Sequence, residues 1–342
     1  MKNNSWIVSP SPFILTRTTV SKMTIILLCT LVPQLGMLAI TGDTKALLNI
    51  LLTVLGSVIA QGLFSLPMHK SFFADEMVFI SGILTGLLLP VDINLFVAFA
   101  SSFAGMSIAR ILFGGTGFNW MNATAVAVAI AWISHPESFP SFVVSSEGVR
   151  TVGSFFGALK LDHFNMISLD QSITTALNSG FLTKFGIKLP EGYITLFWIS
   201  PSTIPAFRYN FLILLSSIIL LSFKIIDWII PTVFIVTYSI LIRLFSLVPF
   251  DIGFFQGDIL FALLTGGILF VAFYMAGDYS TSPRTRSGKI ISGFFSGIVC
   301  FFVCGPGGAP VGAIFTILII NVINPFIECV ERYYYKVSGD FS

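Results

Sequence analysis

One hydroxyl-rich stretch of the chain could carry a covalent group. Residues 172–177 read Ser-Ile-Thr-Thr-Ala-Leu and lie within 135–205, the longest polar interval between apolar runs. A long loop of this kind usually has a function, which favours a hydroxyl that receives a covalent group. The alternative is an ordinary solvated loop in which Thr174 and Thr175 cap a short helix and Ser172 is its N-cap.

A glycine-rich turn before an apolar run is the second candidate. Gly114, Gly115 and Gly117 are followed by Asn119 and Asn122. Glycines allow a ligand or a neighbouring backbone to approach closely, and the start of the next helix offers free N–H donors. A flavin phosphate, a flavin ring edge or a quinone carbonyl could use these donors. Helix packing through small residues, with the asparagines bonded to backbone, explains the same pattern.

Two carboxylates, Asp258 and Asp278, bracket another apolar run. Carboxylates near membrane depth are costly and often mark paths for ions or protons, so both are candidates for an ion path. Each can equally be a residue at a helix end. For Asp278 the alternative is an ion pair with Arg284 or Arg286.

The composition is that of an integral membrane protein. Of the 342 residues, 55% are hydrophobic and 10% are charged, and the mean hydropathy is +0.92, whereas a soluble domain has roughly 25% charged residues. A net charge of +2 without a basic patch predicts no nucleic-acid partner. The four cysteines suggest no disulfide framework, and Cys300 and Cys304 lack further ligands, so no metal site is predicted.

Ten apolar runs approach the length needed to cross a bilayer. We therefore expect an all-α, polytopic protein with about ten transmembrane helices, at 23–40, 46–66, 77–89, 95–112, 120–134, 207–223, 225–245, 259–276, 290–304 and 311–326. Several runs are short or stop at glycine and proline, which predicts helices that break at mid-membrane to line a site.

The two halves of the chain show a weak internal symmetry. Leu-Thr-Gly at 84–86 matches Leu-Thr-Gly at 264–266, and a glycine cluster follows each of them, at 114–117 and at 305–308. Two inverted five-helix repeats would explain this pairing. The expected parts are a segment 1–22, a membrane half 23–134, a polar loop 135–205, a membrane half 206–327 and a tail 328–342.

Basic residues predict the orientation. The loop 284–289 contains two arginines and a lysine and is the strongest cytoplasmic anchor, which places both termini in the cytoplasm and the loop 135–205 on the exported face. No small-residue cleavage pattern ends the first apolar run, so we expect a retained membrane helix.

With these motifs laid out, the chain resembles the RnfD/NqrB family. RnfD is a membrane component of the Rnf ferredoxin:NAD electron-transport complex, and NqrB is its counterpart in the sodium-pumping NADH:quinone reductase. The resemblance covers nearly the whole chain. The similar stretches, in order, are 9–10 with 22–23, 81–90, 113–122, 257–258, 275–278 with 281–283, and 310–312 running to Asn321.

The resemblance implies covalently bound FMN. The family attaches FMN through a phosphoester to a threonine in a pattern like Asp, then Ser-x-Ala-Thr-x-Leu, which puts Thr175 in the acceptor position and Ser172 at the serine. Thr174 stands where the family usually has alanine. A flavin transferase on the exported side would then be the maturation partner, and a second, non-covalent flavin or a quinone is left open.

The chain departs from the family pattern at four places. Asp170 is one residue closer to the acceptor than usual, Ala123 replaces a common proline, and Val311 stands where an acidic residue is common. Pro-Ala-Phe-Arg at 205–208 replaces an expected Gly-Glu-Thr-Ser stretch.

The implied function is that of a subunit in an ion-translocating electron-transport complex of the bacterial inner membrane. The protein would relay electrons through FMN to the other subunits, coupled to Na⁺ or H⁺ transport. It has no iron–sulfur ligand set and no Rossmann glycine pattern, so no complete active site is expected on this chain alone. The alternatives are NqrB of the quinone reductase, which typically has a longer N-terminal extension, and a flavin-free transporter like the urea channels.

Overall fold

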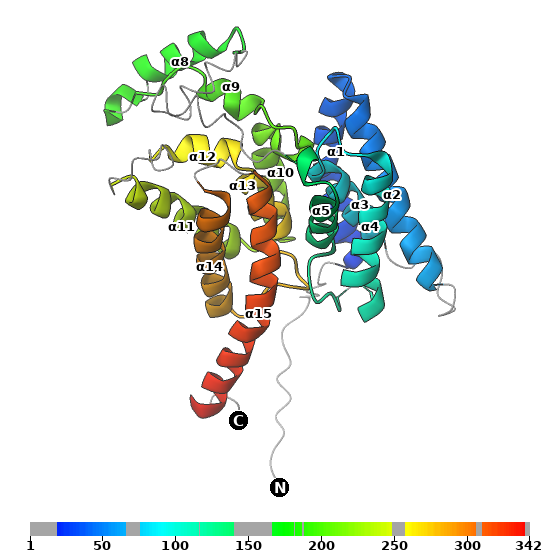
Figure 1. Cartoon of the computed structure of the whole chain (residues 1–342). Coiled ribbons are helices and arrows are strands. Elements are labelled where there is room, and N and C mark those ends of the chain that lie inside the picture. Colours follow the sequence, from blue (N-terminus) through cyan, green and yellow to red (C-terminus); the bar gives the residue numbers. More distant parts are fainter. Residues whose placement is uncertain are drawn as a thin grey trace, which may run out of the picture.

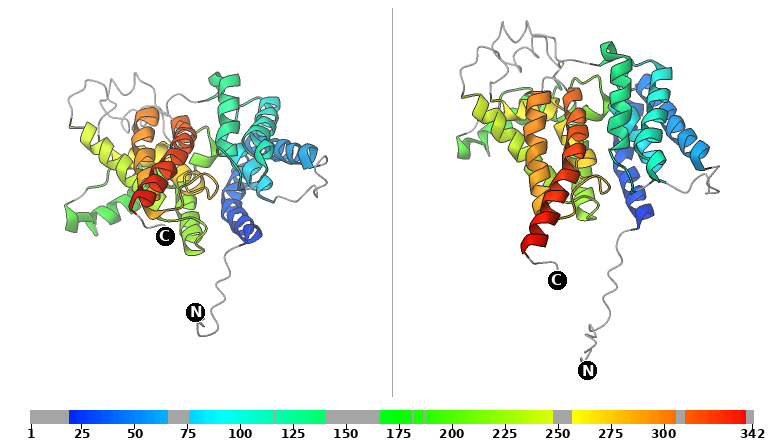
Figure 2. Two further views of the ribbon diagram at one scale, coloured as in Figure 1. Left: turned by 90° about the horizontal axis from the view of Figure 1, so that it is seen from below. Right: turned by 60° about the horizontal axis from the view of Figure 1, so that its bottom comes forward.

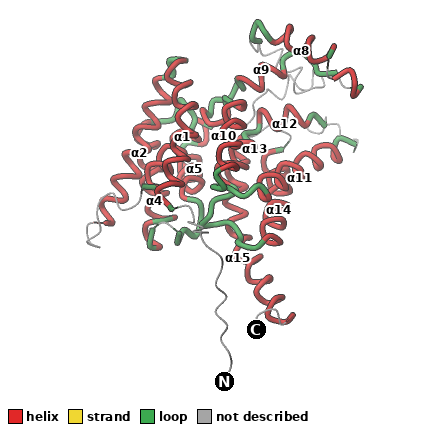
Figure 3. Tube along the Cα trace, turned by 180° about the vertical axis from the view of Figure 1, so that it is seen from behind, coloured by secondary structure: helices red, strands yellow, loops and turns green. Residues whose placement is uncertain are grey.

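The computed structural model of the chain describes residues 19–65, 76–115, 117–139, 166–180, 182–186, 188–247, 257–305 and 310–338. Within these ranges the chain consists of helices and loops without a strand, which confirms the expected all-α class (Figures 1 and 3). Most of the expected N-terminal segment, the first part of the polar loop and the turn after Gly305 lie outside the described residues.

The described part of the first half forms five helices. They are α1 (Val20–Ile40), α2 (Thr44–Ser65), α3 (Met77–Leu88), α4 (Leu95–Ala109) and α5 (Ala123–Ser134), with 3-10 turns η1 (Ile111–Phe113) and η2 (Pro136–Ser138). Thr19, Asn94 and Asn122 accept hydrogen bonds from the first backbone N–H groups of α1, α4 and α5, and so define where these helices begin.

The second half is more interrupted. It contains α10 (Asn210–Ser222), α11 (Ile229–Phe245), α12 (Ile259–Thr265), α13 (Ile268–Phe270), the π-helical turn η6 (Val271–Met275), α14 (Arg286–Cys304) and α15 (Pro310–Ser338). Between the halves lie α8 (Asp170–Ser179), η3 (Leu182–Phe185), α9 (Tyr193–Trp198) and η4 (Pro205–Phe207).

In the described part of the chain, five helical segments are long and apolar enough to cross a membrane, which makes the chain a multi-pass membrane protein. They are Val20–Ile40, Thr44–Ser65, Leu95–Phe113, Arg286–Cys304 and Val311–Tyr334. Shorter apolar helices at Met77–Leu88, Ala123–Ser134, Asn210–Ser222 and Ile229–Phe245 accompany them. All ten predicted runs therefore contain helix.

Two predicted spans differ most from the structure, and the ends of the others shift by a few residues. The run 259–276 is not one helix, because α12 ends at Thr265 and Gly267 adopts a left-handed conformation (φ +68°) before α13 begins. The run 311–326 continues to Ser338, since the polar residues after it still favour helix and Pro325 is accommodated inside α15.

The packing order of the first half recurs in the second. In the first half α2 packs against α4, and α4 against α5; in the second, α11 packs against α14, and α14 against α15. The halves meet where α1 contacts α10 and where α5 contacts α15. The matched threonines Thr85 and Thr265 are both buried and donate to the carbonyl oxygens of Ser81 and Phe261, each at 2.7 Å. These pairings fit two repeats of five spans.

The helix ends define two opposite faces of the bundle. α1 begins and α15 ends at one face, whereas α8 and α9 lie at the opposite face (Figure 1). The right view of Figure 2 again shows the start of α1 and the end of α15 on the same side. This is the relative arrangement that the basic residues predict.

The absolute orientation can be measured with reporter fusions. We expect alkaline phosphatase fused after Lys160 to be active and green fluorescent protein fused after Ser287 to fluoresce, because the 284–289 loop carries the cytoplasmic charge bias. The exchanged fusions serve as controls. A cytoplasmic signal from the fusion after Lys160 would contradict the orientation.

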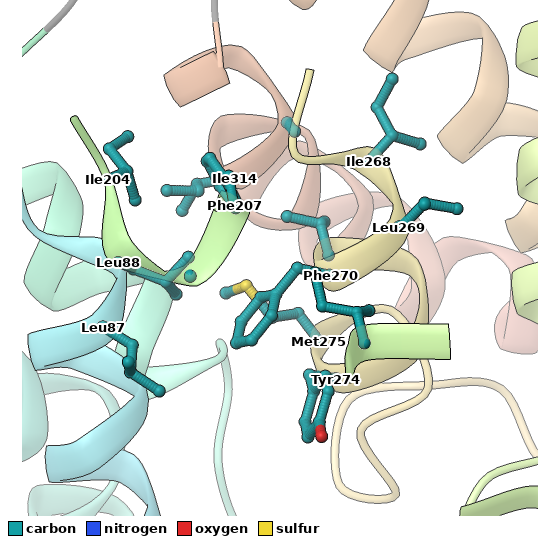
Figure 4. Close-up of a cluster of buried hydrophobic side chains, with 14 of the residues drawn as sticks. Leu87, Leu88, Ile204, Phe207, Ile268, Leu269, Phe270, Tyr274, Met275 and Ile314 are labelled. Carbon is teal, nitrogen blue, oxygen red and sulfur yellow. The ribbon is translucent and has the colours of Figure 1, made fainter. Parts of the chain in front are cut away.

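An apolar cluster fills the centre where the broken helix meets the first half. Phe207 from η4 lies beside Phe270, with ring centroids 6.2 Å apart, and both side chains are fully buried (Figure 4). A Cβ atom built on Gly267 would lie 2.6 Å from three atoms of the Phe207 ring, so only glycine fits there.

Gly267→Ala should therefore destabilise the protein strongly. The left-handed conformation costs a non-glycine residue about 1–2 kcal/mol, and overpacking against Phe207 adds about 1–3 kcal/mol. Thermal unfolding in detergent would measure this loss. Gly42→Ala is the matched control, because Gly42 has φ +73° and no atom within 4 Å of its Cβ position, so it carries the backbone cost alone. Equal shifts in the two variants would argue against the Phe207 contact.

Candidate functional site

Residues 172–177 lie on α8, where adjacent threonines face opposite ways. Thr174 is buried, 2% exposed, and its hydroxyl donates to Asp170 Oδ1 at 3.2 Å. Thr175 is exposed, and its hydroxyl donates to the carbonyl oxygen of Gln171, at 2.7 Å, within the same helix. Of the two neighbouring hydroxyls, Thr175 is thus the one that an enzyme could reach.

The capping interpretation of this stretch is wrong in detail. A short helix is present, but it begins at Asp170 and its N-cap position is Leu169, without a side-chain cap. Ser172 lies inside the helix, and its hydroxyl donates back to the carbonyl oxygen of Leu169 at 2.9 Å. An Asp in the first turn stabilises the helix through the helix dipole, which explains the earlier start.

Asp170 fixes α8 to α9. Its carboxylate is 2% exposed and accepts hydrogen bonds from the backbone N–H groups of Gly192 and Thr195, both at 2.7 Å, and from the Thr195 hydroxyl at 2.5 Å. Burial acts to raise the pKa of Asp170, but hydrogen bonds from Thr195, Gly192 and Thr174 outweigh it and hold the pKa below its usual value. The carboxylate is therefore charged at neutral pH, and the stability that it contributes is lost only as the pH falls through this lowered pKa.

α9 in turn is anchored to the membrane part through Asp258. The Tyr193 hydroxyl donates to Asp258 Oδ2, and Asp258 Oδ1 accepts from the backbone N–H of Phe261 at 3.0 Å as the N-cap of α12. Burial, and then the hydrogen bond to Asp258, raise the pKa of Tyr193, which keeps the phenol protonated as a donor. Asp258 thus lies on the same side of the bundle as the Thr175 helix.

Asp278 lies instead against the glycine turn. Asn122 caps α5 by accepting from the backbone N–H of Ala125 at 3.2 Å, and its Nδ2 donates to Asp278 Oδ2 at 3.3 Å, across 156 positions of sequence. Ser280 also donates to Asp278, at 3.3 Å, and Arg110 lies close enough to interact with its charge. Among the described residues, Asp278 forms no ion pair with Arg284 or Arg286.

The glycines of this turn are not sites of helix packing within the described chain. Gly114, Gly115 and Gly117 all have positive φ, of 115°, 96° and 91°. A Cβ atom on Gly115 or Gly117 would have no described atom within 4 Å, whereas Gly105, on α4, lies directly against Ala127. The turn therefore needs glycine for its backbone conformation and leaves its surface open to a ligand or to a neighbouring protein.

Two cavities meet at Asn119. The Asp278 cavity, of about 90 Å³, is lined by Arg110, Asn119, Asn122 and Asp278 together with apolar side chains from α1, α3 and η6. The Asn119 cavity, of about 400 Å³, lies beside it between the glycine turn, the loop 280–282 and α15. Its volume is in the range of small-molecule sites.

Two buried amide atoms at the Asn119 cavity have no hydrogen-bond partner among the described residues. They are Oδ1 of Asn119 and Nδ2 of Asn321. A buried polar atom without a protein partner is costly, which favours binding of a ligand or a water molecule at this place. Asn324 lines the same cavity, but both of its amide atoms have partners: Oδ1 accepts from Ser292 at 2.8 Å and Nδ2 donates to the carbonyl oxygen of Thr281 at 2.8 Å.

The departures from the expected motif pattern make structural contacts. Arg208 forms an ion pair with Asp43 and donates from Nε to the carbonyl oxygen of Ser202 at 2.8 Å. Ala123 and Val311 are buried, 6% and 5% exposed, near the starts of α5 and α15. The segment 205–208 thus joins the halves, and none of its residues lines the Asp278 cavity or the Asn119 cavity.

Cys300 and Cys304 are both buried on α14. No group of three or more His, Cys, Asp or Glu side chains that could hold a metal occurs in the described ranges.

Three residues at these sites were not predicted from the sequence. Arg110 is 3% exposed beside the Asp278 cavity, and a basic residue within an apolar run was the signal that could have found it. Asn321 was identified only as the end of a motif. Thr195 has no sequence signal, because its partner Asp170 lies 25 positions away.

Known proteins resemble this chain along most of its length. The NQR2, RnfD, RnfE family model matches residues 7–335. The D subunit of the proton-translocating ferredoxin:NAD(+) oxidoreductase complex of Clostridium ljungdahlii is 28% identical, over 96% of this chain and 95% of that protein.

Two further relatives have similar names. The D subunit of the Na(+)-translocating ferredoxin:NAD(+) oxidoreductase complex of Acetobacterium woodii is 24% identical, over 94% of this chain and 92% of that protein. The D subunit of the ion-translocating oxidoreductase complex of Aliivibrio salmonicida is 26% identical, over 82% of this chain and 84% of that protein. A family match that spans nearly the whole chain, on a helical membrane fold, means that this protein belongs to the NQR2, RnfD, RnfE family.

Proposed function

We propose that this chain is a membrane subunit of an Rnf-type ion-translocating ferredoxin:NAD oxidoreductase complex in the bacterial inner membrane. The family match and the names of its relatives support this assignment. The sequence has no nicotinamide fingerprint or iron–sulfur ligand set, so partner subunits would bind ferredoxin and NAD. Both termini would lie in the cytoplasm. NqrB of the sodium-pumping quinone reductase is the alternative within the same family.

The protein would carry FMN covalently on Thr175, and the exposure of this hydroxyl beside a buried Thr174 is the observation that carries the proposal. Attachment from a flavin adenine dinucleotide donor forms a Thr175 Oγ–P bond and breaks the bond between the two phosphates. AMP leaves, and the hydroxyl proton passes to a base of the flavin transferase. The bound FMN would supply one- and two-electron transfer. Asp170 and α9 would hold its attachment helix in place.

A second, non-covalent flavin would bind in the Asn119 cavity. A flavin ring edge presents an N–H donor between two carbonyl acceptors, and each asparagine amide offers both donors and an acceptor. Asn119 Oδ1 and Asn321 Nδ2 are the acceptor and the donor without partners among the described residues there. A quinone offers carbonyl acceptors only, so the free acceptor on Asn119 favours a flavin. The open surface of Gly115 and Gly117 leaves room for a ring at the turn.

Ion coupling would involve a carboxylate near the membrane core. Of the two candidates, Asp278 lines a cavity beside Arg110, whereas Asp258 caps α12 and holds Tyr193. The geometry thus favours Asp278 for exchange of H⁺ or Na⁺. The names of the relatives include both H⁺ and Na⁺. Transport assays with each ion would identify the one that is moved by the complex containing this chain.

The test is whether flavin stays on the chain after denaturation. The protein would be co-expressed with a flavin transferase, purified, and run on a denaturing gel under ultraviolet light. Peptide mass spectrometry over residues 161–184 should then place the FMN mass on Thr175. A colourless, unmodified chain under these conditions would favour a flavin-free, channel-like transporter.

A further inference from the structure

α8 is held in place from outside by two sets of hydrogen bonds. A helix of ten residues is too short to be stable alone in water. At its start, Asp170 accepts from Thr195 and Gly192. At its end, Asn178 donates to the carbonyl oxygen of Leu189 and accepts from the Leu189 N–H, both at 2.8 Å.

These contacts fix the rotation of α8. Asp170, Thr174 and Asn178 lie four residues apart and share the inward face, where they are buried or half-buried. Ser172, Thr175 and Ser179 are exposed on the outward side. The rotation of the helix alone therefore decides which of the two adjacent threonines an enzyme can reach.

Thr195 is the residue on α9 through which this rotation is set. Its side chain is 2% exposed, and its hydroxyl donates to Asp170 Oδ2 and accepts from the Ile167 N–H at 3.2 Å. It lies far outside residues 170–177 and so cannot belong to a linear recognition sequence around the acceptor. Any effect of Thr195 on flavin attachment must act through the position of α8.

We propose that Thr195 is a positioning residue that selects Thr175 over Thr174 as the flavin acceptor. This proposal rests on the attachment of FMN proposed above. Thr195 holds Asp170, Asp170 holds the Thr174 hydroxyl, and Thr175 is left exposed at the surface. Without the Thr195 hydroxyl, α8 docks less firmly and Thr174 becomes accessible as well.

The test compares Thr195→Val with Thr195→Ser, each co-expressed with a flavin transferase. Valine keeps the shape of threonine but removes the hydroxyl that bonds a charged carboxylate. We expect the rate of flavin incorporation at Thr175 to fall about tenfold, and FMN to be found also on Thr174 by fragment mass spectrometry. Thr195→Ser keeps the hydroxyl and should behave as wild type in both readouts.

Asn178→Ala is the control for simple loosening of the helix. It removes the contact at the other end but leaves Thr174 bound to Asp170, so attachment should slow without modification of Thr174. Modification of Thr174 in this variant, or a wild-type rate and site in Thr195→Val, would overturn the proposal. An unmodified wild-type chain would instead refute FMN attachment itself. Size-exclusion chromatography in detergent confirms that each variant is folded.

Discussion

Thr175→Val is expected to abolish covalent flavin completely while the protein still inserts and folds. Valine keeps the shape of threonine, but no oxygen remains to form the phosphoester. Thr175 is exposed, and among the described residues its hydroxyl bonds within its own helix. Its loss should therefore change the free energy of unfolding by no more than about 0.5 kcal/mol. In-gel flavin fluorescence measures the first effect, and thermal unfolding in detergent measures the second.

Two other hydroxyls on α8 provide controls. Ser179→Ala removes an exposed hydroxyl from the same helix, and Thr174→Val removes the buried neighbour. Both variants should keep their fluorescence. Flavin that persists in Thr175→Val, or disappears in Ser179→Ala, would contradict the assignment of the acceptor.

Asn321→Leu is expected to have opposite effects on stability and on flavin binding. Asn321 is 5% exposed and its Nδ2 has no partner in the described chain. Leucine removes that unsatisfied donor, so the ligand-free protein should become more stable by about 1 kcal/mol or more. The same change removes a hydrogen bond to the ligand, so non-covalent flavin should bind about tenfold more weakly.

The measurement uses the Thr175→Val background, in which only non-covalent flavin remains. Flavin extracted with acid is quantified per chain, and the affinity is obtained by fluorescence titration. Asn324→Leu is the matched control, because both ends of the Asn324 amide are bonded within the protein. It should destabilise the chain. A destabilised Asn321→Leu that retains flavin would show that Asn321 is structural.

The contrast between Asn321 and Asn324 shows why the cavity could not be identified from the sequence. Both asparagines lie on α15 within one turn of each other, and no sequence pattern shows which of them has hydrogen-bond partners in the folded chain. Their roles depend on the groups across from them. Asn324 bonds to Ser292 and Thr281, whereas Asn321 lines the cavity with Asn119 and its Nδ2 has no partner among the described residues.

Local sequence is sufficient to predict the membrane spans and the helix ends, because these depend on residues that are neighbours in the chain. Apolar runs predicted the spans, because a helix in lipid must satisfy its own backbone. Asn122 defined the start of α5, and Pro90 the end of α3, through local steric and hydrogen-bond effects. The similar motifs also pointed to Thr175.

Contacts between distant parts of the chain decided the rest. Asp278 met Asn122, and Asp170 met Thr195, only because the two halves and the α8–α9 pair pack together. The break at Gly267 likewise depends on the Phe207 ring, which comes from the segment between the halves and occupies the space of a side chain. Which threonine faces outward was fixed in the same way, since the rotation of a ten-residue helix is set by what its inward face binds.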